Sequence, residues 1–257
     1  MTEMYQEIAD LLSRGEKAVL ATVVNSDGSS PRKPGAKMLV HKDGSIAGTV
    51  GGGTLEQEVR EKAGEVMFTG RHSLLHFDLS GQEKGPGICG GQVDVFLEPL
   101  MPAESLIVAG AGHIGLAAAA IGRMLGFHVT VIDPRPELNN ADRFSAVDSL
   151  VVGEYADALR KTGMDSNSYV LICTSGHAFD EECLYVASRS EARYVGMIGS
   201  RKKVKEVKER LLARGVPQDC LNRVHAPVGL DIGAETSEEI AVSIMAQIVK
   251  IRRGDQP

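Results

Sequence analysis

Cys89 stands in a run of glycines, within the segment GPGICGGQVDVFLEPL that covers residues 85–100. Gly90 and Gly91 follow the cysteine directly, so successive backbone N–H groups can converge on whatever its sulfur holds. Such surroundings stabilise the thiolate, which is the form of cysteine that binds metals and attacks electrophiles. The alternative is a small buried hydrophobic residue, as most free cysteines are. The glycine context favours a chemical role for Cys89, as a metal ligand or as a catalytic nucleophile.

A second glycine cluster, GAGHIG, covers residues 110–115 and matches the G-x-G-x-x-G fingerprint. It follows an apolar segment and opens a predicted helix, which is the context that a dinucleotide-binding turn requires. Gly110 permits a tight turn, Gly112 lets a pyrophosphate approach the backbone, and Gly115 lets the helix pack on the strand. Asp133 closes the next predicted strand, where a carboxylate can hold ribose hydroxyls. These residues predict a Rossmann-like fold, but the fold does not decide which ligand is bound.

Two side chains near this fingerprint have open roles. His113 lies inside the fingerprint, at the expected start of the helix, where the helix dipole favours the neutral imidazole. Its side chain could line the crevice as a functional residue, or it could simply be the residue that starts the helix. Arg135 follows Asp133 closely and could contact a phosphate, which leaves the choice between NAD and NADP open.

Polar residues also follow a later strand, in the segment TSGHAFDEE at residues 174–182. His177 and Asp180 are therefore expected near the carboxyl edge of the sheet, where open α/β proteins bind ligands. Both are candidate catalytic residues that move protons, and both could instead cap the next helix.

A third set of glycines, Gly51, Gly52 and Gly53, precedes the helical pattern TLEQEVREKAGEVMF. A glycine loop that opens a helix leaves free N–H groups, so we expect a candidate anion site here. Thr54 is the expected cap of this helix.

The elements that position these residues form two groups. Residues 1–101 read as a smaller α+β domain, with a first helix, a strand, a hairpin that turns at 42–45, a second helix and two more strands. From residue 102 to 257, apolar strands alternate with helices, which is typical of a doubly wound parallel sheet covered on both faces. A C-terminal helix, with Ser237 as its expected cap, completes this Rossmann-like domain.

The composition excludes several classes of protein. The net charge is -6, and the basic run at 201–210 contains interleaved glutamates, which fits a solvated helix face better than a nucleic-acid site. No apolar run reaches the roughly 18 residues of a membrane span, and the first residues do not form a secretion signal, so we expect a cytoplasmic protein. The four cysteines form no close pair, which disfavours disulfides and structural zinc. A homodimer is the default expectation.

Taken together, the segments resemble the xanthine dehydrogenase accessory family, XdhC/CoxI. The resemblance covers nearly the whole chain and is carried by GSSPRKPGAKMLV, GTVGGGTLE, CGGQVDVFLEP, GAGHIG with VIDPRPE, YVGMIGSRKK and HAPVGLDIGAETSEEIAVSIMAQI. One departure is TSGHAFD, where a second histidine or an acidic residue would be expected in place of Ser175-Gly176. This departure weakens a catalytic assignment to that loop.

The resemblance implies a protein that binds the molybdenum cofactor, assists its sulfuration and inserts it into a xanthine dehydrogenase-type molybdenum hydroxylase. The implied partners are that hydroxylase and a cysteine desulfurase, and Cys89 would hold or hand over sulfur at the molybdenum end. Two alternatives stay open on the residues: an NAD(P)-dependent oxidoreductase, and a regulatory nucleotide sensor without chemistry.

Overall fold

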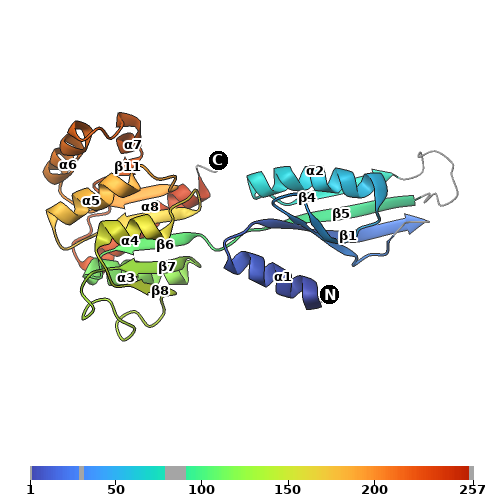
Figure 1. Ribbon diagram of the computed structural model, residues 1–257, viewed down its shortest axis with the longest axis horizontal. Helices are drawn as coiled ribbons and strands as arrows, with labels where there is room; N and C mark the ends of the chain where they lie inside the picture. The colour runs from blue at the N-terminus through green and yellow to red at the C-terminus, as the bar shows by residue number, and fades with distance from the viewer. Residues whose placement is uncertain (1, 29–31, 79–90, 255–257) are drawn as a thin grey trace. The chain divides into compact units, whose positions relative to one another are not determined.

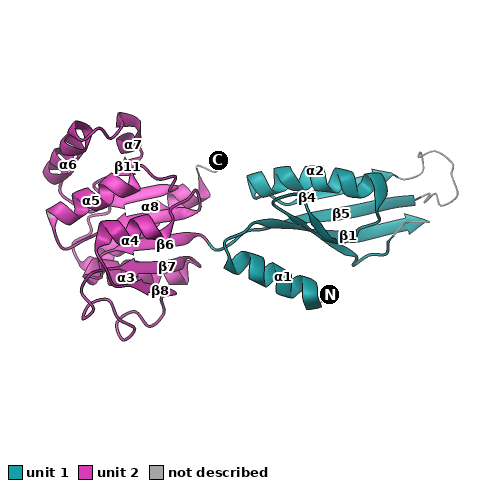
Figure 2. Cartoon of the chain, in the orientation of Figure 1, with its two compact units in different colours: residues 1–103 teal, residues 104–257 magenta. Residues whose placement is uncertain are grey.

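The computed structural model describes residues 2–28, 32–78 and 91–254, and of His177 the backbone. The chain divides into two compact units, Met1–Ala103 and Glu104–Pro257 (Figure 2). Each unit has its own sheet and its own hydrophobic core.

The first unit is a five-stranded antiparallel sheet with the order β3-β2-β1-β5-β4. Its elements are α1 (Thr2–Ser13), β1 (Ala18–Gly28), β2 (Lys37–His41), β3 (Ile46–Gly48), α2 (Gly53–Thr69), β4 (Ser73–Asp78) and β5 (Gly91–Leu100) (Figure 1). The hairpin of β2 and β3 is confirmed, and Gly44 takes the positive φ of 81° that the Asp-Gly turn predicts.

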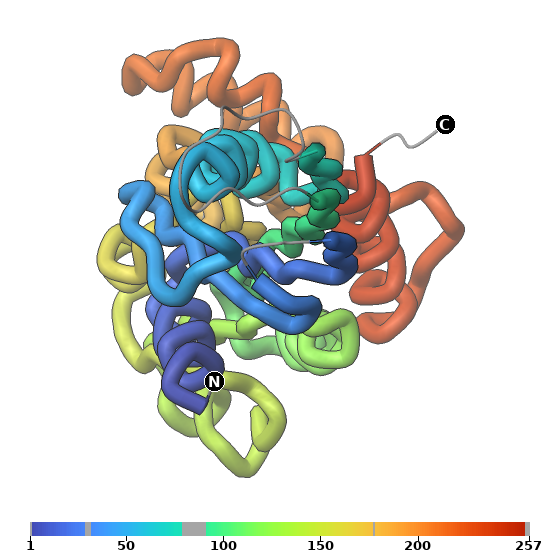
Figure 3. The backbone as a smooth tube through the Cα atoms, turned by 90° about the vertical axis from the view of Figure 1, so that its right-hand side faces the viewer, coloured from blue at the N-terminus to red at the C-terminus, as the bar shows by residue number. Residues whose placement is uncertain are grey.

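The two helices of the first unit lie on opposite faces of its sheet. Leu55, Val59 and Ala63, at helical spacing along α2, pack against the strand residues Val19 and Val95. Leu11 of α1 packs against Ala18 and Leu39 on the other face. Figure 3 shows α2 in cyan and α1 in dark blue on either side of the blue strands.

The second unit is a six-stranded parallel sheet with the order β11-β10-β9-β6-β7-β8. Its elements are β6 (Ser105–Ala109), α3 (His113–Met124), β7 (His128–Ile132), β8 (Ser149–Val151), α4 (Tyr155–Thr162), β9 (Ser168–Ile172), α5 (His177–Ala187), β10 (Tyr194–Met197), α6 (Arg201–Ala213), α7 (Gln218–Asn222), β11 (Val224–His225) and α8 (Ser237–Arg253). The Rossmann-like sheet is confirmed.

Alternation along β6 explains how both faces of this sheet are covered. Leu106 and Val108 point to the side where α3 and α8 pack. Ile107 and Ala109 point to the other side, where α4, α5 and α6 pack. The strands are therefore apolar on both faces, which is why they read as continuous apolar runs in the sequence.

The path of the chain through this sheet creates a change of direction at its carboxyl edge. From β6 the chain moves to β7 and β8 on one side, and it then crosses to β9 on the other side. Adjacent strands β6 and β9 therefore lead into loops that run in opposite directions, which is the topological switch point where open α/β sheets bind ligands.

Helix α8 begins with a capping box. The Thr236 hydroxyl accepts from the Glu239 N–H, and the Glu239 carboxylate accepts from the Thr236 N–H, so the cap is Thr236 and the expected Ser237 is the first helical residue. None of the helices formed by the described residues combines the length and the apolar character that spanning a lipid bilayer requires.

Candidate functional site

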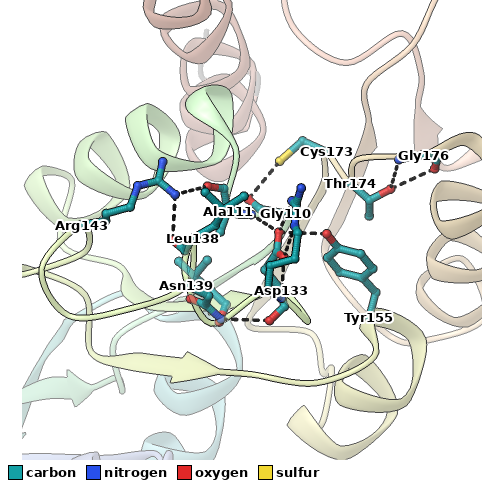
Figure 4. A network of polar contacts seen from close by, with 12 residues as sticks. Gly110, Ala111, Asp133, Leu138, Asn139, Arg143, Tyr155, Cys173, Thr174 and Gly176 are labelled. Atoms are coloured by element: carbon teal, nitrogen blue, oxygen red, sulfur yellow. Dashed lines mark hydrogen bonds and ion pairs between the residues drawn. The ribbon is translucent and has the colours of Figure 1, made fainter.

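The turns after β6 and β9 are packed against each other through their backbones. The Cys173 N–H donates to the Ala109 carbonyl at 2.9 Å, and the Cys173 thiol donates to the Gly110 carbonyl at 3.6 Å (Figure 4). Gly110 has a φ of 131°, and a Cβ there would lie 2.2 Å from the Cys173 carbonyl oxygen. A Cβ at Gly115 would lie 1.9 Å from the Gly110 carbonyl oxygen, which confirms its packing role. Both glycines are therefore required by close approach.

Gly112 differs from these two glycines because the space beside it is open. A Cβ added there would have no described atom within 4 Å. Gly112 is also the N-cap of α3, and within the described part of the chain no side chain caps this helix. The first N–H groups of α3 are thus left for water or for an anion. His113, the first residue of α3, is exposed beside them.

Asp133 lies at the end of β7 and is fully buried. Its Oδ2 accepts from the Ala111 N–H and from the Tyr155 hydroxyl, each at 2.8 Å, as Figure 4 shows. Arg135 donates from Nε to Oδ1 at 2.8 Å and from Nη2 to Oδ2 at 2.7 Å. Burial favours the neutral acid, but these donors outweigh it and lower the pKa of Asp133 to about 2. The carboxylate is therefore an anion that fixes the glycine turn.

These contacts limit the ribose-binding role that was predicted for Asp133. Both of its oxygens are engaged by protein donors, so a ribose hydroxyl would have to replace one of them. That role stays a prediction. Arg135, by contrast, keeps 35% of its side chain exposed while Asp133 holds it in place. The guanidinium is the group of this pair that an anionic ligand can reach.

Asp180 organises the loop after β9. It is buried, and its Oδ1 accepts from the Thr174 N–H at 3.1 Å and from the Thr174 hydroxyl at 2.6 Å. Its Oδ2 forms an ion pair with the Lys203 ammonium of α6. The catalytic role predicted for Asp180 stays a prediction, as does that of His177, whose backbone starts α5 and whose side chain lies outside the described structure.

The Cys173 thiol faces the same buried carboxylates. Burial and, after it, the negative charges of Asp180 and Asp133 raise the pKa of Cys173 to about 12. This thiol is therefore protonated at neutral pH and is no nucleophile in the structure described here.

Three residues of this site were missed by sequence reasoning. Tyr155 follows β8 without a motif, and burial followed by the contact with Asp133 raises its pKa to about 12. Lys203 lies inside the basic run 201–210, and its side chain is 15% exposed although its neighbours Arg201 and Lys202 are exposed. Thr174 was read as part of a polar loop. No spacing signal marks Tyr155 and Lys203, because their partners Asp133 and Asp180 are more than 20 residues away in the sequence.

In the first unit, the backbone N–H groups of the glycines before α2 donate to a carboxylate of the same chain. Glu56 Oε1 accepts from the N–H groups of Gly52 at 2.9 Å, Val50 at 3.2 Å and Gly51 at 3.4 Å. It also accepts from the Thr49 hydroxyl. Burial would raise the pKa of Glu56, but these donors lower it overall.

This arrangement affects two expectations for the same loop. The helix begins at Gly53 with Gly52 as its N-cap, so Thr54 is the second helical residue and is not the cap. An anion site at Gly51, Gly52 and Gly53 stays a prediction, and it would require the Glu56 carboxylate to leave.

Of the remaining predicted residues, Gly91 is the first residue of β5. Gly91 pairs with Gly28, and a Cβ at Gly91 would lie 2.0 Å from the Asp27 carbonyl oxygen, so glycine permits the strands to approach. Cys89 and Gly90 lie outside the described residues, and their roles stay predictions. Within residues 2–28, 32–78 and 91–254, no group of three His, Cys, Asp or Glu side chains is arranged to hold a metal ion.

Comparison with known proteins follows the division into two units. The XdhC Rossmann domain family matches residues 106–248, and the XdhC and CoxI family matches residues 11–78. The protein YqeB of Escherichia coli K12, described as uncharacterized, is 33% identical over 252 residues, which are 97% of this chain and 46% of that protein. The chain thus spans less than half the length of this relative.

Other relatives match over most of their length. A Bacillus subtilis protein, described as a probable component of xanthine dehydrogenase, is 24% identical over 95% of this chain and 96% of its own. The molybdenum cofactor insertion chaperone PaoD of Escherichia coli K12 is 24% identical, over 95% of this chain and 86% of its own. The crystal structure of a xanthine dehydrogenase from Bacillus halodurans superimposes with a TM-score of 0.55 at 26% identity, over 98% of this chain and 96% of the other. The chain belongs to the XdhC and CoxI family.

Proposed function

We propose that this chain binds the molybdenum cofactor and delivers it to a xanthine dehydrogenase-type molybdenum hydroxylase. Membership of the XdhC and CoxI family supports the proposal, and so does the relative that is named a molybdenum cofactor insertion chaperone. The observation that carries it in this chain is the turn after β6. There, among the described residues, no side chain caps the start of α3 and the space beside Gly112 is open, and Asp133 joins the partly exposed Arg135 of the next loop to this turn.

The residues of this turn fit the phosphate of such a cofactor. A molybdopterin carries a phosphate arm and a dithiolene that holds molybdenum. A phosphate suits the start of α3, because backbone N–H groups and the positive end of the helix favour an anion there. The Arg135 guanidinium adds a fixed positive charge, since its contact with Asp133 keeps it oriented. Apart from this phosphate site, Cys89 is our candidate metal ligand from the sequence, because sulfur ligands suit soft metal centres.

In this proposal the chain binds and orients its cargo and does not turn over a substrate. When bound, the cofactor supplies the redox chemistry that the target hydroxylase uses. Asp133 keeps the glycine turn and Arg135 in place, and Gly112 leaves room for the phosphate. The finer part of the same proposal is that the chain assists sulfuration of the cofactor. A cysteine desulfurase would be the sulfur donor, and Cys89 would be the residue that receives or passes the sulfur.

The test is to express the full chain in cells that make the cofactor, purify it, and measure pterin fluorescence and molybdenum content. We expect both in a fixed ratio to protein, and transfer to an apo-hydroxylase on mixing. Gly112→Ala should reduce the retained pterin, whereas Gly153→Ala is the matched control, because that glycine also has open space around it. A nicotinamide in place of the pterin, or equal loading of both variants, would contradict the proposed site.

Cys89 needs a separate variant. Cys89→Ala should retain the pterin phosphate contacts but lower activation of the target enzyme, and Cys220→Ala is the control, as a partly buried cysteine elsewhere in the chain. Full activation by Cys89→Ala would remove the sulfur role and leave cofactor delivery standing.

A further inference from the structure

Phe179 is an aromatic residue that neither the fingerprint nor the family resemblance explains. It lies in the first turn of α5, directly before Asp180, and 44% of its surface is exposed. Its ring is held in place from one side, because its centroid lies 5.5 Å from that of the buried Tyr155 ring, tilted by 56°. A partly exposed ring that is braced by a buried tyrosine is suited to binding another flat ring.

The backbone at Gly176 lies close to the Phe179 ring. Gly176, the N-cap of α5, would bring an added Cβ to 3.3 Å from the Phe179 Cδ2 atom. Any larger residue would therefore crowd the ring. Among the described residues no side chain caps α5, so the start of this helix, like that of α3, is left without an internal acceptor.

A continuous set of contacts joins Phe179 to the candidate phosphate site. The Phe179 ring packs on Tyr155, the Tyr155 hydroxyl donates to Asp133 at 2.8 Å, and Asp133 holds Arg135. One buried tyrosine and one buried carboxylate thus separate an exposed aromatic ring from a partly exposed cation. The ring and the cation thus flank the same buried pair, as the two ends of a ligand that joins a flat heterocycle to a phosphate would require.

We propose that Phe179 is the stacking platform for the heterocycle of the ligand whose phosphate lies at the β6 turn. The ligand class is a planar nitrogen heterocycle linked to a phosphate, which can be a pterin or a nucleotide. The phosphate position rests on the proposed function, whereas the stacking role of Phe179 is independent of which heterocycle is bound. Phe179 is thus a binding residue that selects flat rings.

The test uses 6-hydroxymethylpterin phosphate as the probe and measures its fluorescence on titration with the full chain. The sequence contains no tryptophan, so the pterin signal is free of that background. Phe179→Ala should weaken binding by about 5- to 150-fold, which corresponds to about 1–3 kcal/mol for the loss of a stacked ring. Phe179→Leu, which keeps bulk without a flat ring, should also weaken binding. Phe68→Ala is the matched control, because Phe68 of α2 is 92% exposed.

A gain of signal checks that the effect is stacking and not loss of fold. Phe179→Trp should bind at least as tightly as the natural chain, and the new tryptophan fluorescence should be quenched when the pterin binds. Unphosphorylated 6-hydroxymethylpterin should bind more weakly to every variant, and the ratio between natural chain and Phe179→Ala should stay the same for both probes.

Parallel titrations with NADPH separate this inference from the proposed function. If the chain binds the pterin and Phe179→Ala and Phe179→Leu bind it equally well, the stacking role is wrong and cofactor delivery stands. If the chain binds NADPH and no pterin, with the same dependence on Phe179, the stacking role stands and the proposed function is wrong. If it binds neither probe, both are overturned.

Discussion

The buried Asp133 anion leads to a prediction about stability. In Asp133→Asn, a single amide oxygen would replace two carboxylate oxygens that accept from Ala111, Tyr155 and Arg135, so at least one donor loses its acceptor. Arg135 also loses its charge partner, although its 35% exposure lets water compensate in part. We expect the free energy of unfolding of the second unit to fall by about 2–3 kcal/mol at pH 7.

The shifted pKa of Asp133 gives a second figure for the same contacts. A pKa lowered from 3.8 to about 2 corresponds to about 2–3 kcal/mol of stabilisation, at about 1.4 kcal/mol per unit. Because the pKa is lower in the folded state, this contribution is complete above pH 3.8 and is lost as the pH falls through about 2. The difference between Asp133→Asn and the natural chain should therefore be equal at pH 7 and pH 5.

Tyrosine fluorescence during urea unfolding is the assay, since the chain lacks tryptophan. Four of the five tyrosines report on the second unit, namely Tyr155, Tyr169, Tyr185 and Tyr194. Asp142→Asn, at an exposed position, is the control and should change stability by less than about 0.5 kcal/mol. A loss at Asp133 as small as that of the control, or one that shrinks between pH 7 and pH 5, would refute the assignment of a buried anion.

Three further predictions concern the two glycine turns. Gly110→Ala should lower the stability of the second unit by about 2–5 kcal/mol, because of the positive φ and the contact with Cys173, and an unchanged thermal unfolding midpoint would contradict this. Cys173 should react with iodoacetamide at pH 8 at least about 100-fold more slowly in the folded chain than in the denatured chain. Peptide mass spectrometry measures the two rates, and equal rates would show that the thiol is not held protonated. Glu56→Gln should destabilise the first unit by about 1–2 kcal/mol at pH 7, and by less below pH 4.5, because folding lowers the pKa of Glu56. Circular dichroism during urea unfolding measures the difference in stability, and a difference that does not depend on pH would rule out a charge effect.

Much of the second unit was predictable from the sequence. Its strands are buried on both faces and therefore appear as apolar runs, and the glycines at 110–115 mark the turn between the first strand and helix. Different steric reasons fix Gly110 and Gly115, and both follow from the fingerprint. Helix starts were less predictable, since Thr54 and Ser237 were each expected as caps and lie inside their helices.

The partners of the charged residues were not predictable. Asp133 was expected to face a ligand, and it is buried because Tyr155 and Ala111 come to it from other elements. Lys203 was read as part of a solvated helix face, and it reaches Asp180 only because α5 and α6 follow neighbouring strands. Such contacts depend on the three-dimensional arrangement, for which periodicity and spacing carry no signal.

The Glu56 carboxylate occupies the N–H groups of the loop at 49–52, and this has a consequence for how tightly that loop could hold an external anion. Any external anion competes with a tethered one, so its apparent affinity is reduced by the fraction of time that Glu56 stays away. An anion bound in this loop, a site that stays a prediction, would therefore be held weakly and released quickly, which is compatible with the proposed delivery role.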